Sequence, residues 1–134
     1  QYELGRKVPF IIWSKDMKHT SLNMEVKNVM GMYDVMPTIG NMLGIYNQYA
    51  LGNDIFNTKE NNIVVFPNGN WVTNKVYYNS QKGEYLSLVN EAISEEEIKN
   101  NNAYANALLD VSNDIIVFNK LKKKDEIEEI KEIE

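Results

Sequence analysis

The chain contains no cysteine and a single histidine, His19, among its 134 residues. Without cysteine it can form neither a disulfide scaffold nor a thiolate metal site. One histidine is too few for the common transition-metal sites, which combine several imidazole or thiolate ligands. A Ser-His-Asp catalytic set would have to use His19, and no nucleophile motif lies near it. We therefore assign no catalytic, cofactor-binding or metal-binding residue to this chain.

Long apolar runs and excess positive charge are also absent. No stretch reaches the roughly 20 apolar residues that span a membrane, and we expect no signal peptide at the start. The formal net charge of −5 argues against a nucleic-acid partner, because phosphate binding needs a basic face. The length and the 43% hydrophobic content predict a soluble chain with one core.

The clearest helical pattern lies in residues 33–45. Asp34 is the expected N-cap, with its carboxylate accepting from N–H groups of the first turn, and Pro37 suits that turn. Gly44 is typical of the left-handed residue that ends a helix. Apolar side chains recur at helical spacing and predict one short, buried core helix: Val35, Met36, Ile39, Met42 and Leu43.

The apolar run Val8–Trp13 predicts a strand covered on both faces, as in the middle of a parallel sheet. The polar segment Ser14–Met30 follows, and its basic or titratable residues are Lys15, Lys18, His19 and Lys27. The segment is either a basic lip that meets an anionic substrate or a solvated loop. We favour the loop, because mixed surface charge is common.

The middle of the chain predicts an antiparallel meander of about three strands. The first strand is residues 62–66, and Asn68-Gly69 predicts a type I′ turn with positive φ at both residues. The return strand is residues 71–78, and a second turn leads to a strand at residues 84–89. Four aromatic residues of this meander suggest either a stacking platform for sugars or bases, or cross-strand pairs: Trp71, Tyr77, Tyr78 and Tyr85. The pairs are favoured because few basic residues are interleaved.

Ser94–Glu97 is a capping box that predicts the start of a helix reaching about Ser112. The three carboxylates could also be read as metal ligands, but the cap explains them without a cofactor. Residues 114–119 fit either a short edge strand or a helical extension. Lys120–Glu134 is a charged tail in which Ile127, Ile130 and Ile133 fit one side of a short helix.

The predicted fold class is α+β. A strand and a helix in residues 1–60 precede a small antiparallel meander with a packed helix in residues 61–119. The charged helical tail occupies residues 120–134. No internal repeat or low-complexity linker interrupts this order.

Three segments carry a resemblance to a known family. Arg6–Ile12 and Asp34–Ile45 resemble the last strand and helix of the sulfatase/alkaline-phosphatase superfamily core. Val64–Thr73, with Tyr77-Tyr78 and Lys82–Glu84, is similar to the C-terminal subdomain of lipoteichoic acid synthases and related phosphoglycerol transferases. The resemblance covers residues 6–118 and implies that residues 1–60 contain a partial sulfatase-like α/β core element.

The resemblance implies a membrane-anchored enzyme, a phosphoglycerol transferase or phosphodiesterase, with its large domain outside the cell. Such enzymes move glycerol phosphate from phosphatidylglycerol to a cell-envelope polymer with a divalent metal, often manganese, and a threonine nucleophile. In that family the nucleophile and an adjacent Asp-His metal pair lie upstream of the strand matched by Val8–Trp13. No family catalytic or metal residue maps onto this sequence.

We therefore expect a C-terminal fragment that is inactive on its own and whose partner is the missing upstream catalytic domain. The alternative is a non-catalytic module that binds an envelope glycan or polymer, or that serves an interaction role. A strand cut from its sheet leaves unpaired backbone and apolar surface, so we also expect a homodimer or a strand swap through Val8–Trp13.

Overall fold

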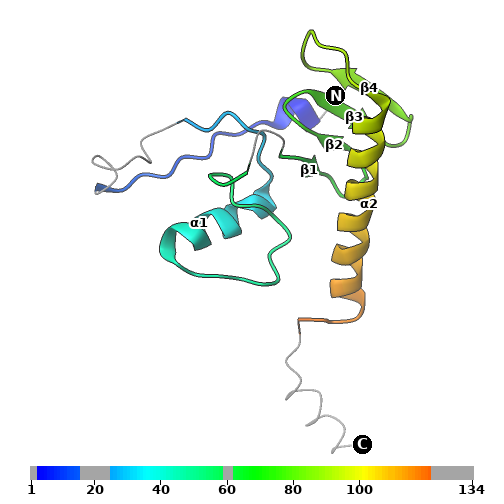
Figure 1. Cartoon of the computed structure of the whole chain (residues 1–134). Coiled ribbons are helices and arrows are strands. Elements are labelled where there is room, and N and C mark those ends of the chain that lie inside the picture. Colours follow the sequence, from blue (N-terminus) through cyan, green and yellow to red (C-terminus); the bar gives the residue numbers. More distant parts are fainter. Residues whose placement is uncertain (1–2, 16–24, 59–61, 122–134) are drawn as a thin grey trace, which may run out of the picture.

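The computed structural model describes residues 3–15, 25–58 and 62–121 (Figure 1). Short 3-10 helices and one α-helix come first, a small sheet follows, and a long helix ends the described chain. In chain order the elements are η1 (Glu3–Arg6), η3 (Met32–Asp34), α1 (Val35–Leu43), β1 (Val64–Val65), β2 (Trp71–Val72), β3 (Val76–Asn79), β4 (Glu84–Ser87) and α2 (Glu95–Val117). The predicted α+β class is confirmed.

The sheet is a four-stranded antiparallel meander with the order β1-β2-β3-β4. The predicted single strand over residues 71–78 is wrong, because a two-residue turn at Asn74-Lys75 divides it into β2 and β3. Thr73 stabilises this turn: its N–H donates to the Val76 carbonyl at 2.8 Å, and its Oγ1 accepts from the N–H groups of Lys75 and Val76 at 3.2 and 3.0 Å.

The first hairpin also differs from the prediction. The Phe66 N–H donates to the Asn70 carbonyl at 2.8 Å, so the loop is the three residues 67–69. Gly69 has φ +83°, whereas Asn68 is not among the described residues with positive φ. This pattern fits a three-residue hairpin loop with a left-handed glycine and not a type I′ turn. Pro67 favours it, because its ring holds φ negative.

The sheet is covered on both faces, and its strand alternation separates two clusters. Helix α2 covers one face, where Ala105 packs with Ile63, Val65, Trp71 and Val76. On the other face the cluster is Val64, Val72 and Tyr77, with Leu4, Val29, Tyr33 and Phe66 packed against it. The core of the molecule therefore lies on the two faces of this small sheet.

Helix α2 begins as predicted and ends later than predicted. The Ser94 hydroxyl accepts from the Glu97 N–H at 3.1 Å, which confirms the cap. The helix continues to Val117. Of the two alternatives for residues 114–119, a short edge strand or a helical extension, the helical extension is therefore the one observed for residues 114–117. In residues 3–15, 25–58 and 62–121 no helix is long and apolar enough to cross a membrane. The predicted tail helix around Ile130 lies outside the described residues.

Helix α1 confirms one expectation and corrects two. Gly44 ends it at φ +68°, and the Ile45 N–H donates to the Gly40 carbonyl at 2.7 Å, which is the predicted left-handed ending. The Asp34 side chain makes no cap bond to the first turn of α1. The helix is not buried as predicted: Met36 is 62% exposed, and the buried residues are Thr38 and Gly40.

The predicted strand at Val8–Trp13 is also wrong, because this segment pairs with no strand that the structure describes. It leads away from the sheet in Figure 1. Its side chains are largely in solvent, with Ile11 80% and Trp13 75% exposed. A run without ladder partners remains irregular here, whatever its intrinsic preference for strand.

The carboxylate of Asp34 is fully buried and accepts three hydrogen bonds. Its Oδ2 accepts from the Gly31 N–H at 2.8 Å and from Asn62 Nδ2 at 2.9 Å. Its Oδ1 accepts from the Asn53 N–H at 2.8 Å. These bonds join η3, the loop after α1 and the residues before β1. The 3-10 turn at η3 aims the carboxylate backwards, which explains why it does not cap α1.

Close backbone packing reinforces this junction. A Cβ at Gly52 would lie 2.2 Å from the Tyr33 carbonyl oxygen, so only glycine fits there without a backbone shift. Thr38 adds a further link, since its Oγ1 donates to the Asp34 carbonyl at 2.6 Å and accepts from the Ile55 N–H at 3.1 Å. The loop after α1 is thereby held against the start of the helix.

We predict that Asp34→Ala lowers the free energy of unfolding by about 3–5 kcal/mol, because three buried donors lose their acceptor. Asp34→Asn keeps one carbonyl oxygen and should lose less. Urea unfolding measures both variants. Asp110→Ala is the matched control at an exposed position, with an expected change within about 0.5 kcal/mol. Equal stability of Asp34→Ala and wild type would contradict this role.

Candidate functional site

The aromatic residues of the meander do not form an open stacking surface. Trp71 is 0% exposed and Tyr77 is also buried. The rings of Trp71 and Tyr78 stack with centroids 5.3 Å apart, and Trp71 Nε1 donates to Asn102 Oδ1 on α2 at 2.7 Å. Tyr85 alone of the four is mostly in solvent. Cross-strand pairing is confirmed, since Tyr78 lies opposite both Trp71 and Tyr85.

The basic segment after Trp13 is only partly described. Lys15 and Lys27 are exposed, whereas Lys18 and His19 lie outside the described residues. Two hydrogen bonds attach the end of the segment to the β2–β3 turn: the Val29 N–H donates to Asn74 Oδ1 at 2.7 Å, and Asn74 Nδ2 donates to Asn28 Oδ1 at 2.8 Å. The choice between a substrate-facing lip and a solvated loop stays a prediction.

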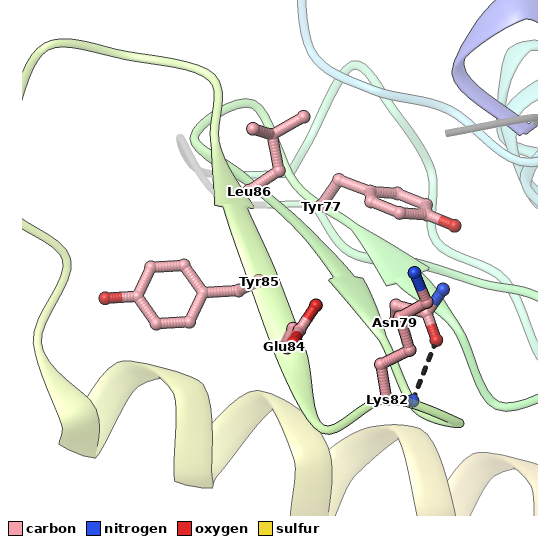
Figure 2. Close-up of a pocket in the computed structure, with 6 residues that line it drawn as sticks. All are labelled: Tyr77, Asn79, Lys82, Glu84, Tyr85 and Leu86. Carbon is pink, nitrogen blue, oxygen red and sulfur yellow. Dashed lines mark hydrogen bonds between the residues drawn. The ribbon is translucent and has the colours of Figure 1, made fainter.

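A shallow depression of about 380 Å³ lies on the β3–β4 hairpin (Figure 2). Its lining residues are Tyr77, Asn79, Lys82, Glu84, Tyr85 and Leu86. Strand pairing assembles it, because Tyr77 lies opposite Leu86 and Asn79 lies opposite Glu84. The backbone N–H of Lys82 donates to Asn79 Oδ1 at 3.0 Å, which shapes the turn at its lower end.

This depression offers binding groups without a catalytic pair. Tyr85 points to the opposite side of β4 from Tyr77 in Figure 2 and adds little to the floor. The ammonium of Lys82, the carboxylate of Glu84 and the amide of Asn79 can bind a polar group. The lining contains no histidine and no hydroxyl or thiol of the serine, threonine or cysteine type. It therefore lacks a nucleophile with an adjacent base.

Two carboxylates of the described chain, those of Asp34 and Asp54, accept several hydrogen bonds from protein N–H groups. Asp34 accepts the three hydrogen bonds given above. Asp54 accepts from Asn41 Nδ2 at 2.6 Å and Asn57 Nδ2 at 2.5 Å through one oxygen, and from the Phe56 N–H through the other. Within the part of the chain that the structure describes, no group of three histidine, cysteine, aspartate or glutamate residues could hold a metal ion.

The hydroxyl of Tyr33 occupies the outer edge of β1. It accepts from the Val65 N–H at 2.8 Å and donates to the Ile63 carbonyl at 3.2 Å, so one side chain replaces a neighbouring strand. Burial raises the pKa of this hydroxyl to about 12, from an ordinary value of 10.0. The group is therefore protonated at neutral pH and serves as a structural donor and acceptor. Sequence patterns gave no signal for this role.

Comparison with known proteins finds no family model that matches the chain and no solved structure that matches its fold.

The raised pKa of Tyr33 predicts a pH-dependent loss of stability. Above pH 10 the unfolded chain releases this proton while the folded chain retains it, so the free energy of unfolding falls until about pH 12. Tyr33→Phe should flatten this fall and lower stability at pH 8, because Val65 and Ile63 lose their partner. Urea titrations across this range measure both effects. Tyr85→Phe is the exposed control, and an equal flattening there would contradict the assignment.

Proposed function

We propose that this chain is the C-terminal part of a metal-dependent phosphoglycerol transferase of the sulfatase/alkaline-phosphatase superfamily. The whole protein would be anchored in the membrane and would act at its extracellular face. It would transfer glycerol phosphate from phosphatidylglycerol to a cell-envelope polymer. Its catalytic residues would lie in an upstream domain, and this chain would be inactive alone.

The uncovered apolar surface of the first part of the chain is the observation that carries the proposal. The sheet and α2 enclose a core, whereas Val8, Ile11 and Trp13 are left in solvent. Exposed apolar side chains also lie along and just after α1, namely Met36, Leu43, Ile45 and Tyr46. Burying a large apolar side chain contributes about 1.5–3 kcal/mol, so a surface of this extent favours a larger body that covers it.

The two uncovered segments are also the ones that carry the superfamily resemblance. Arg6–Ile12 resembles the last strand of that core, and α1 lies within Asp34–Ile45, which resembles the helix that follows this strand. In the proposed full protein the upstream domain supplies the neighbouring strands, and α1 packs on the sheet they complete. This arrangement would give Val8–Trp13 the ladder partners that it lacks among the described residues.

The described residues do not fit the divalent metal that the superfamily implies. Asp34 and Asp54 already accept several N–H donors, so neither offers an open carboxylate edge. We therefore assign the metal and the nucleophile to the upstream domain. What this chain would contribute is apolar surface that completes the core of the catalytic domain.

We predict that Ile11→Asp affects the chain and the full protein differently. At concentrations at which the chain alone is monomeric, Ile11 is 80% exposed, so the free energy of unfolding should change by about 0.5 kcal/mol or less. In the full protein the aspartate would be buried without a partner, and we expect a loss of about 3 kcal/mol or more. Thermal unfolding measures both. Lys99→Asp, on the exposed side of α2, should be neutral in each.

The transferase assay completes this test. Full protein with Mn²⁺ and a phosphatidylglycerol analogue should release diacylglycerol, and the 134-residue chain should not. Turnover by the chain alone would overturn the proposal. So would an upstream reading frame without a threonine nucleophile and an Asp-His pair, or an Ile11→Asp variant that leaves the full protein as stable as wild type.

The uncovered segment also predicts self-association of the chain on its own. We propose a homodimer, in which Val8–Trp13 of each copy contacts the other, because that contact removes apolar side chains from water. Light scattering should show a mass that rises with concentration, and Ile11→Asp should return it to the monomer. A monomer at all concentrations would contradict this.

A further inference from the structure

The C-terminal part of α2 projects beyond the strands that its first part covers (Figure 1). Its core contacts come from Ile98, Ala105, Leu108 and Leu109. Past them, exposed apolar side chains gather at the end of the helix: Ile116, Val117, Phe118 and Leu121. We call these four residues the apolar tip. Ile116 is 74% exposed, although it continues the helix face that packs on the sheet.

The tip is held in a defined conformation. Asn119 adopts a left-handed φ of +49°, and the Lys120 N–H donates back to the Ile115 carbonyl at 3.1 Å, which closes the helix end. Lys120 Nζ lies 3.0 Å from Asp114 Oδ2 and 5.6 Å from the centre of the Phe118 ring. The exposed apolar side chains therefore lie at a helix C-terminus whose backbone is held by its own hydrogen bonds.

Lysine is concentrated in the sequence at the end of the tip, where Lys120 is described and Lys122, Lys123 and Lys124 lie outside the described residues. Four of the five residues 120–124 are lysine, in a chain whose net charge is −5. Exposed apolar side chains beside a lysine block are typical of segments that lie in a membrane interface, where each lysine near anionic headgroups contributes about 1 kcal/mol. We propose that the apolar tip docks on an anionic phospholipid surface.

A second copy of the chain fits the tip less well. Specific stable interfaces bury about 1,200–2,000 Å² in total, and four side chains per copy cannot supply that area. The acidic residues that follow, six carboxylates in residues 125–134, oppose lipid binding. We therefore expect salt-sensitive association that strengthens in Asp125→Asn/Glu126→Gln.

Sedimentation with vesicles tests the proposal on the 134-residue chain. Phosphatidylglycerol mixed with phosphatidylcholine should bind the chain at low salt, and phosphatidylcholine alone should bind it weakly. Ile116→Ser/Phe118→Ser should weaken binding about tenfold or more, because two inserted side chains are removed. Lys122→Glu/Lys124→Glu should weaken it on anionic vesicles and reduce its salt dependence. Met36→Ser/Leu43→Ser, which alters exposed apolar residues of α1, is the matched control.

Several results would overturn docking at the tip. These are equal binding to both vesicle types, loss of binding in the α1 control but not in the tip variant, or no binding at all. A mass in sedimentation equilibrium that falls in the tip variant, without vesicle binding, would assign the tip to a second copy. The inference rests on the proposed function for the choice of lipid. Its failure leaves the Ile11→Asp comparison and the transferase assay unaffected, so the two proposals fail separately.

Discussion

The buried carboxylate of Asp34 is the constraint on which the first half of the chain depends. A charge that is fully removed from water is tolerated only when donors replace its hydration. Here the donors come from Gly31, Asn53 and Asn62, which lie on three separate segments. Gly31, Asn53 and Asn62 all lie outside the strands of the described sheet. The carboxylate thus links these loops as backbone pairing links the strands of the sheet, and it ties the turn that precedes α1 to the residues before β1.

The described chain has one part whose apolar side chains are buried in a core and another part whose apolar side chains lie in solvent. Trp71 and Val76 lie fully buried between the sheet and α2, and Tyr33 closes the free edge of β1. Within the described residues, the segment Val8–Trp13 and the side of α1 that carries Met36 and Leu43 have no such cover. The same asymmetry recurs within α2: its first part packs on the sheet, whereas Ile116 and Val117 at its end are exposed. Each of these surfaces is apolar, which is why we propose an upstream domain as the cover of the first two and a lipid surface as the partner of the third.

Local chemistry accounts for the parts of the fold that were predicted correctly. Ser94 and Gly44 act within one helical turn of their own position, so their neighbours in sequence suffice to define them. The error at Asp34 arose because the outcome depends on distant groups. Aspartate is a residue type that favours the N-cap position, yet the side-chain oxygens of Asp34 accept hydrogen bonds from donors up to 28 residues away. The hairpin at Asn68-Gly69 was mistaken because the pairing of Phe66 with Asn70, and not the dipeptide, sets the loop length.

The amino-acid sequence by itself determined the α+β class, the start of α2 at Ser94, the left-handed end of α1 at Gly44 and the small number of candidate catalytic side chains. Tertiary structure alone decided which apolar stripes are covered. Val35–Leu43 and the last turns of α2 show helical patterns much like that of a core helix, and yet Met36 and Ile116 lie in solvent. The physical reason is that periodicity specifies which side of an element is apolar, whereas burial requires a second surface that packs against that side. Whether such a surface is present depends on the tertiary structure.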